Sequence, residues 1–381
     1  MRRLPAILAC ALLAGAAHAA ELRLTLLAPA DDPRLERDRV ERAYLGHPTG
    51  PAADGVKLAL DESRFELDAA GHRVALATVA VDSPEAARSA AASAVKGGAA
   101  MLLVDLPAAW TVAVAEAARV PVINMGEASD ALREADCRAN LFHTLPSERM
   151  RADALAQTLV AQRWTNVLLL AGSGPADAAR SAVVEGALKR YGLKVVAKKP
   201  FKLSADPRER DLANPLLLTA GSGYDVVWVV DSDGEFARLL PYRTAQPRPV
   251  VGDAGLAAVA WHAQFERFGA PQVSRRFQRA AGRAMTGHDW AAWIAGKAAV
   301  AAVLGGGGKN GLAALVKTAV DGSKGVSLGF RPWDGQLRQT LLLTDGQGVV
   351  ATAPVDGMLH PRNVLDTLGA DAPEQRCKAP R

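Results

Sequence analysis

Two residues that could do chemistry, Cys137 and His143, lie in the stretch EADCRANLFHTLPS (134–147). A cysteine can serve as a nucleophile, as a metal ligand or as one half of a disulfide bond. The C-x5-H spacing of this pair lacks the two further ligands that a structural zinc ion requires. Whether Cys137 is a thiol or half of a disulfide depends on the compartment of the protein, which the N-terminus indicates.

Residues 1–19, MRRLPAILACALLAGAAHA, have the order of a secretory signal peptide. Two arginines precede a short apolar run, and small residues at its end form a cleavage site. We therefore expect export, with a mature chain that begins at Ala20 and has lost Cys10. Attachment of a lipid to Cys10 is the alternative, which the short apolar run before that residue disfavours.

Removal of this segment leaves two cysteines, Cys137 and Cys377. In an oxidising compartment such a pair is most simply a disulfide, which would tie the C-terminal tail to the middle of the chain. In the chain-entropy model, closing so long a loop contributes about 4–5 kcal/mol to stability. A reactive thiol is the alternative, and it requires a neighbouring base or another group that stabilises the thiolate.

Motifs of catalysis and cofactor binding are incomplete in this chain. GSGPAD (172–177) follows an apolar run as a dinucleotide loop does, but Asp177 takes the third small position. GGGGKN (305–310) has Asn310 where a phosphate loop has a hydroxyl, and no G-x-S-x-G elbow is present. No two histidines have metal-ligand spacing. We therefore expect no catalytic residue, no catalytic cofactor and no metal site, and an exported α/β enzyme is the remote alternative.

The composition is that of an ordinary globular protein, with 49% hydrophobic and 22% charged residues. The formal net charge is +5, and loss of the two signal-peptide arginines lowers it to +3. The basic residues are scattered along the chain, so we expect no nucleic-acid partner.

Short apolar runs alternate with alanine-rich amphipathic stretches, which predicts an α/β fold with parallel sheets covered on both faces. The rhythm restarts near residue 144, and a mature chain of roughly 360 residues exceeds one ordinary core, so we expect two lobes. The Asp334-Gly335 and Asp345-Gly346 dipeptides predict tight turns in the tail. The expected strands are 21–28, 73–81, 99–106, 120–128, 166–174, 194–203, 224–233 and 248–255. The expected helices are 55–67, 83–98, 110–120, 147–164, 176–192, 234–243, 289–304 and 312–320.

Ligands of open α/β sheets bind outside the carboxyl ends of the strands, where loops and helix N-termini converge. The helix N-termini favour an anion, and aromatic residues in such loops can stack on a flat ligand. A role in the core is the alternative for each tryptophan. The candidate ligand-binding residues in or beside these loops are Tyr44, Asp105, Trp110, Asn124, Glu127, Ser173, Asp231, Asp253 and Trp261.

The segments GVKLALDESRF (55–65) and VSLGFRPWDGQLRQTLLLT (326–344) resemble those of the type I periplasmic solute-binding proteins. This family includes the branched-chain amino-acid receptors of ABC importers. The resemblance implies a periplasmic monomer with two Rossmann-like lobes, a small-molecule ligand and a membrane permease as partner. It also implies a Venus flytrap that closes over three chain crossings near residues 144, 284 and 340. The implied boundaries are 20–143 with 285–340 for the first lobe and 144–284 with 341–381 for the second.

Four segments, DCRANLFHTLPS, LLPYRTAQPRPVVGDAGL, FRPWDGQLRQTLLL and LHPRNVLDTLGADAPEQRC, are similar to a subfamily associated with PQQ-dependent alcohol dehydrogenase systems. This similarity implies that the ligand is pyrroloquinoline quinone (PQQ) or a metabolite of that alcohol-oxidation pathway. PQQ is planar and carries three carboxylates, which Arg180 and Arg243 would suit. The amino-acid receptors imply instead that Asp253 takes a ligand's amino group, although Asp105 replaces their serine. An amino-acid or small-amide receptor or sensor is therefore the alternative.

Overall fold

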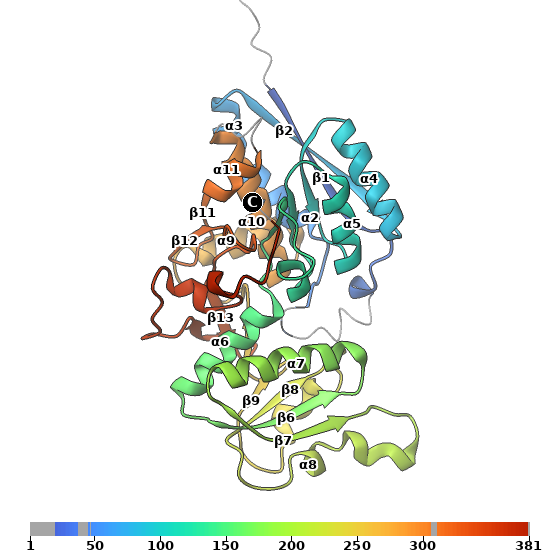
Figure 1. Ribbon diagram of the computed structural model, residues 1–381, viewed down its shortest axis with the longest axis vertical. Coiled ribbons are helices and arrows are strands. Elements are labelled where there is room, and N and C mark those ends of the chain that lie inside the picture. Colours follow the sequence, from blue (N-terminus) through green and yellow to red (C-terminus); the bar gives the residue numbers. More distant parts are fainter. Residues whose placement is uncertain (1–19, 37–44, 46, 306–310, 380–381) are drawn as a thin grey trace, which may run out of the picture.

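Two parallel sheets organise the computed structural model, which describes residues 20–36, 45, 47–305 and 311–379 (Figure 1). The first sheet has the strand order β2-β1-β3-β4-β5 and the second the order β7-β6-β8-β9, with every neighbouring pair parallel. We call the parts built around them the first lobe and the second lobe. The predicted α/β fold with two parallel sheets is confirmed. The strands are β1 (Ala20–Pro29), β2 (His72–Val81), β3 (Ala99–Val104), β4 (Val122–Asn124), β5 (Leu141–His143), β6 (Asn166–Gly172), β7 (Lys194–Phe201), β8 (Val226–Val230) and β9 (Val250–Gly252).

Helices cover the faces of these sheets (Figure 1). They are α2 (Ala53–Glu62), α3 (Arg64–Ala69), α4 (Pro84–Lys96), α5 (Ala108–Ala117), α6 (Glu148–Ala161), α7 (Pro175–Arg190), α8 (Pro215–Leu218), α9 (Ala270–Ala281), α10 (Gly287–Leu304) and α11 (Gly311–Lys317). On β3, Met101 and Leu103 enter a core shared with α2 and α10, whereas Leu102 and Val104 enter one shared with α4 and α5. Because successive side chains point to opposite faces, a strand covered on both faces is apolar throughout.

Helices α2 and α10 approach closely because glycines face the neighbouring helix. A Cβ on Gly296 would lie 2.7 Å from the Cβ of Ala59, and one on Gly55 would clash with the backbone oxygen of Asp289. Only a hydrogen atom fits at these two positions. Helix α10 begins with a capping box, in which the side chains of Thr286 and Asp289 accept hydrogen bonds from each other's backbone N–H. These contacts fix the N-terminus of α10 against the first lobe.

A separate antiparallel sheet lies where the two lobes meet, and its strands are β10 (Ala257–Val259), β13 (Leu341–Thr344) and β14 (Val349–Ala353). Neighbouring residues of β13 belong to different cores. Leu342 packs in the first lobe, whereas Leu341 and Leu343 pack in the second. The predicted turn at Asp345-Gly346 joins β13 to β14.

The segment that follows β10 belongs to the first lobe. Val273 and Phe277 lie one turn apart on α9 and are buried in the core that contains Val56 of α2. The predicted boundaries, which assign this segment to the second lobe with a crossing near residue 284, are wrong here. The structure places that crossing at β10, because the apolar face of α9 is covered by α2.

Three predicted helices differ in detail from the structure. The helix predicted at 55–67 is divided between α2 and α3. Residues 234–243 form only the 3-10 turn η4 (Ala237–Tyr242), because Pro241 inside it has no N–H to donate. The helix predicted at 312–320 ends early, and its last residues form β11 (Ala319–Asp321), which pairs with β12 (Ser327–Gly329). The other predicted helices and strands are present with shifted or shorter ends.

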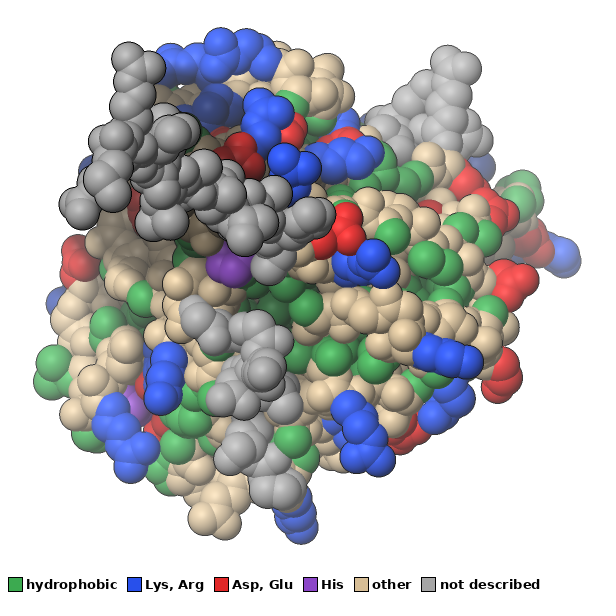
Figure 2. All heavy atoms as spheres, turned by 90° about the horizontal axis from the view of Figure 1, so that it is seen from above, with side chains coloured by type: hydrophobic (Ala, Val, Ile, Leu, Met, Phe, Trp, Pro, Cys, Tyr) green, Lys and Arg blue, Asp and Glu red, His purple; other side chains and the backbone are tan. Residues whose placement is uncertain are grey.

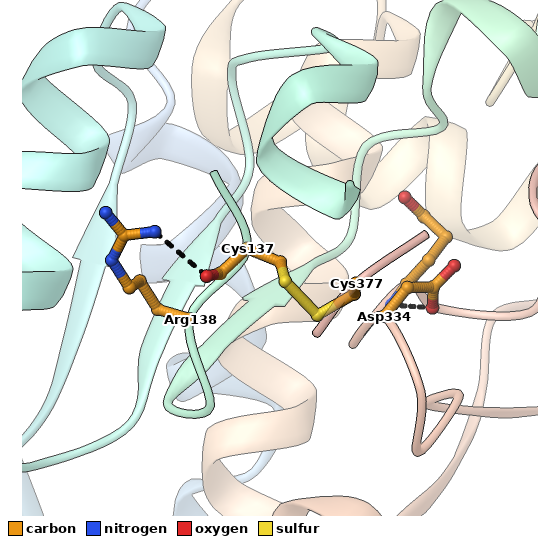
Figure 3. The surroundings of a disulfide bond; sticks show 5 residues. Cys137, Arg138, Asp334 and Cys377 are labelled. Carbon is orange, nitrogen blue, oxygen red and sulfur yellow. Dashed lines mark hydrogen bonds between the residues drawn. A yellow bond between two sulfur atoms is a disulfide. The ribbon is translucent and has the colours of Figure 1, made fainter. Parts of the chain in front are cut away.

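The C-terminal tail returns to the first lobe. A disulfide joins Cys377 to Cys137 with a Cα–Cα distance of 5.7 Å, and Arg138 donates to the carbonyl of Cys137 at 3.0 Å (Figure 3). Nearby, Glu374 accepts two hydrogen bonds from Arg149, at 3.0 and 2.6 Å. The predicted disulfide is confirmed. The predicted assignment of the whole tail to the second lobe is wrong at its end, because the disulfide anchors that end to the first lobe.

The predicted signal segment, residues 1–19, lies outside the described residues. Among the residues that the structure describes, no helix combines the length and the hydropathy needed to cross a bilayer. Basic, acidic and apolar side chains are interspersed on the face shown in Figure 2.

We predict that reduction of the Cys137–Cys377 bond lowers the free energy of unfolding by about 5 kcal/mol, because the bond closes a long loop in the unfolded chain. Urea unfolding followed by circular dichroism, with and without dithiothreitol, measures this difference. The variant Cys137→Ser/Cys377→Ser should match the reduced protein and should not respond to dithiothreitol. Rapid alkylation of Cys137 in the native protein without reductant would contradict the bond.

Candidate functional site

A cavity of about 330 Å³ lies between the two lobes, at the carboxyl ends of both sheets. This is the position at which ligands of parallel sheets bind. The residues that line it from the first lobe and the first crossing are Arg34, Leu45, His47, Pro48, Gly126, Glu127, Ala128, Leu145 and His288. Those from the second lobe and β10 are Glu148, Arg151, Ala152, Leu155, Arg180, Val183, Val184, Trp228, Val229, Val230, Ser232, Gly252, Asp253, Ala257 and Ala258.

Asp105, directly after β3, organises the first-lobe wall of the cavity. Its buried carboxylate accepts a hydrogen bond from Nη2 of Arg34 and contacts Nε2 of His288, each at 2.9 Å. Burial alone would raise the pKa of Asp105, but His288 and Arg34 more than offset it and hold that pKa well below its usual range. Arg34 also donates to Asp32 at 2.7 Å. An ionised carboxylate therefore fixes two of the side chains that line the cavity.

Arg180, on α7, organises the wall of the second lobe. It donates to Asp253, after β9, and to Glu148, at the start of α6, where the distance is 3.4 Å. Burial raises the pKa of Asp253, although Arg180 opposes this shift. Burial would also raise the pKa of Glu148, but Arg180 and Arg151 more than offset it, so that pKa is lowered. The result is a chain of alternating cations and carboxylates along one side of the cavity.

Three of the predicted site residues line the cavity, namely Glu127, Arg180 and Asp253. Three others lie directly behind it. Asp105 holds Arg34 and His288, as described above. Asn124 donates to the carbonyl of Glu127 at 2.7 Å and accepts from its N–H at 2.9 Å, which shapes that loop. Asp231 donates its backbone N–H to Asp253 at 2.7 Å.

The other predicted site residues do not line the cavity. Trp261 is buried and stacks on Trp290 with ring centroids 6.3 Å apart, so it belongs to the core of the first lobe. Trp110 packs against the core under α4 and α5. Ser173 and Arg243 are exposed, and Tyr44 lies outside the described residues.

Sequence reasoning missed several residues that line the cavity, including Arg34, Arg151, Trp228 and His288. Trp228, in the body of β8, is buried in the core of the second lobe and also contributes to the cavity wall. His288 meets Asp105 across 183 residues of sequence, so no local pattern indicates the contact. The one available signal for Arg151 is its place in the first turns of a helix that directly follows a chain crossing. Within the described part of the chain, no three His, Cys, Asp or Glu side chains gather as a metal site.

Comparison with known proteins agrees with this architecture. The family model described as periplasmic binding protein matches residues 46–246, which is more than half of the chain. The chain belongs to the periplasmic binding protein family. Comparison with curated protein sequences returns no match.

Solved structures of this family share the fold at low sequence identity. A branched-chain amino acid ABC transporter periplasmic ligand-binding protein from Burkholderia xenovorans is 14% identical, with a TM-score of 0.74, over 94% of this chain and 99% of that one. A solute-binding protein from R. palustris in complex with benzoate is 14% identical, with a TM-score of 0.63, over 89% and 98%. One from Rhodopseudomonas palustris BisB5 in complex with 3,4-dihydroxybenzoic acid is 13% identical, with a TM-score of 0.63, over 85% and 92%.

We predict that Asp105→Asn lowers the free energy of unfolding at pH 7 by about 3–5 kcal/mol, because it removes the buried negative charge that pairs with His288 and Arg34 and leaves His288 buried without a carboxylate. The pKa of Asp105 is lower in the folded than in the unfolded chain, so its contribution is complete above about pH 5 and declines as the pH falls further. The difference between wild type and variant should therefore shrink between pH 6 and pH 3 in urea unfolding curves.

The matched control for this experiment is Asp68→Asn, which changes an exposed carboxylate. It should leave the free energy of unfolding within about 0.5 kcal/mol of wild type. A difference between wild type and Asp105→Asn that stays constant from pH 6 to pH 3 would show that the Asp105 carboxylate is not stabilised by its partners.

Proposed function

We propose that this protein is the periplasmic ligand-binding component of an ABC importer and that it captures a small organic carboxylate. The observation that carries the proposal is the make-up of the cavity, which combines an apolar wall with arginine side chains in about 330 Å³. Pockets for small molecules have volumes of about 300 to 1,000 Å³ and combine apolar walls with a few polar groups. Binding between two lobes is also the arrangement that the family's fold provides.

The chemistry of the walls supports a ligand with a flat body and an anionic group. Leu155, Val184 and Trp228 contribute apolar surface to the cavity wall from the second lobe. The guanidinium group of an arginine can donate two parallel hydrogen bonds to one carboxylate. The neighbours in complex with benzoate and 3,4-dihydroxybenzoic acid support the same class, because both ligands are planar carboxylates.

A finer proposal rests on the sequence resemblance to binding proteins of PQQ-dependent alcohol dehydrogenase systems. It names PQQ, or a carboxylate metabolite of that alcohol-oxidation pathway, as the ligand. The second candidate is an amino acid or small amide, because Glu127 and Asp253 place carboxylates in the lining where they could accept from an ammonium or amide group. The neighbour described as a branched-chain amino acid binding protein supports this alternative.

The proposed cycle needs no covalent step and no catalytic residue. The lobes close about the three chain crossings once the ligand occupies the cavity, which is a hinge motion. The closed monomer then presents its ligand to a membrane permease. A sensor with the same binding step is the alternative within this fold, and the family is one of binding proteins, which supports a role without catalysis.

We predict saturable binding of at least one carboxylate at micromolar concentration when the mature protein is titrated with benzoate, 3,4-dihydroxybenzoate and PQQ, with leucine as the amino-acid arm. Isothermal calorimetry measures the affinity, and tryptophan fluorescence reports on the cavity because Trp228 lines it. Trp228→Phe should remove most of the fluorescence change while the calorimetric heat persists. The control Trp110→Phe, outside the cavity lining, should keep the fluorescence change.

Comparison of the ligands in this titration distinguishes between the proposed ligand classes. Saturation with leucine alone would replace the carboxylate proposal by the amino-acid alternative. Absence of PQQ binding beside clear binding of another carboxylate would remove the finer proposal and leave the class intact.

A further inference from the structure

The three arginines that line the cavity differ in how completely they are hydrogen-bonded. Arg34 donates to both oxygens of Asp32 and to Asp105, at distances from 2.7 to 3.2 Å. Arg180 is held between Glu148 and Asp253. Both guanidinium groups are therefore occupied by carboxylates of the protein itself.

Arg151 has far fewer contacts. Among the described residues its one hydrogen bond is to Glu148, at a long 3.4 Å, and its Nε is buried without a partner. The guanidinium carries five N–H donors, and a buried donor without a partner destabilises the folded protein. The side chain is 26% exposed and lines the cavity, so a ligand can reach it.

Two further buried polar atoms without partners belong to residues that line the same cavity. Ser232 Oγ and His288 Nδ1 have no hydrogen-bond partner, and both residues line the cavity from opposite lobes. Buried polar groups in folded proteins are nearly always hydrogen-bonded, so such exceptions at one place point to a missing partner. The missing partner of a guanidinium is an anion or another acceptor.

We infer that Arg151 binds the carboxylate of the ligand, through the N–H groups that no residue of the protein occupies. This inference rests on the proposed function and deepens it. Arg151 is a specificity-determining residue, and Ser232 and His288 contribute further hydrogen bonds to the same ligand.

The charges of the lining limit the ligand further. The described lining contains three arginines and the three carboxylates Glu127, Glu148 and Asp253, so these groups together carry no excess of positive charge. One guanidinium is left for the ligand, which therefore enters with a single carboxylate directed at Arg151 and an apolar body against Trp228. Any additional carboxylate on the ligand must stay towards solvent, because no other arginine in the described lining has a comparable set of open donors.

The test compares wild type with Arg151→Gln and Arg151→Lys, using benzoate and its neutral isostere benzamide in calorimetric titrations. In wild type we expect benzoate to bind about 10- to 100-fold more tightly than benzamide, which is the range for a charge-assisted hydrogen bond. Arg151→Gln should abolish this preference by weakening benzoate alone. Arg151→Lys should retain part of the preference for benzoate, because lysine keeps the positive charge but cannot donate two parallel hydrogen bonds to one carboxylate. The same loss should extend to 3,4-dihydroxybenzoate and PQQ.

The matched control is Arg149→Gln, two residues earlier on α6, whose side chain pairs with Glu374 and does not line the cavity. It should lower stability but leave the affinity for benzoate within about twofold, as for a change outside the site. Retained binding of benzamide to Arg151→Gln shows that this variant is folded. If wild type prefers benzoate and Arg151→Gln keeps that preference, the inference is overturned while the proposed function stands. If wild type binds no carboxylate, both are overturned.

Discussion

The fold depends on hydrogen bonds to the buried backbone carbonyl groups at the crossings between its lobes. The chain leaves the first sheet at His143 and has no ladder partner along much of the segment that follows. Buried side chains supply the missing hydrogen bonds: Gln339 donates to the carbonyl of Thr144 at 2.8 Å, and Arg133 and Gln336 donate to that of Leu145 at 2.9 and 3.1 Å. Leaving these groups unpaired would cost more than their pairing contributes. The first and third crossings are therefore held to each other.

This bonding also explains how the cavity obtains its shape. Leu145 lines the cavity at the first crossing, and Glu148 and Arg151 follow within two turns of α6. Because Arg133 and Gln336 hold Leu145 in place, the start of α6 is positioned from the first lobe although its helix belongs to the core of the second. The polar side chains of the site therefore sit on rigid elements at the hinge, and a movement of one lobe changes their distance from Asp105 and His288 on the other.

The sequence predicts the repeating strands and helices well because each signal is local. Apolar runs that are buried on both faces, such as β3, cannot be mistaken for an exposed strand. Glu127 and Asp253 were also predictable, because the carboxyl ends of parallel strands form one edge. The tryptophans show the limit: Trp261 was expected in the site and packs on Trp290 in the core, whereas Trp228 is a core residue that also contributes to the cavity wall. Which core or cavity a tryptophan enters depends on packing between distant segments, and the segment that forms α9 was assigned to the wrong lobe for the same reason.

The disulfide has a topological consequence. Cys137 precedes the first crossing and Cys377 follows the last, so the chain between them is a covalent ring that contains the entire second lobe. A protease that cuts one loop of that lobe opens the ring without separating the fragments, and both cut ends stay tethered to the first lobe. The second lobe is thus an insertion inside a closed circle, and a single cut in it leaves the molecule in one piece as long as the bond is oxidised.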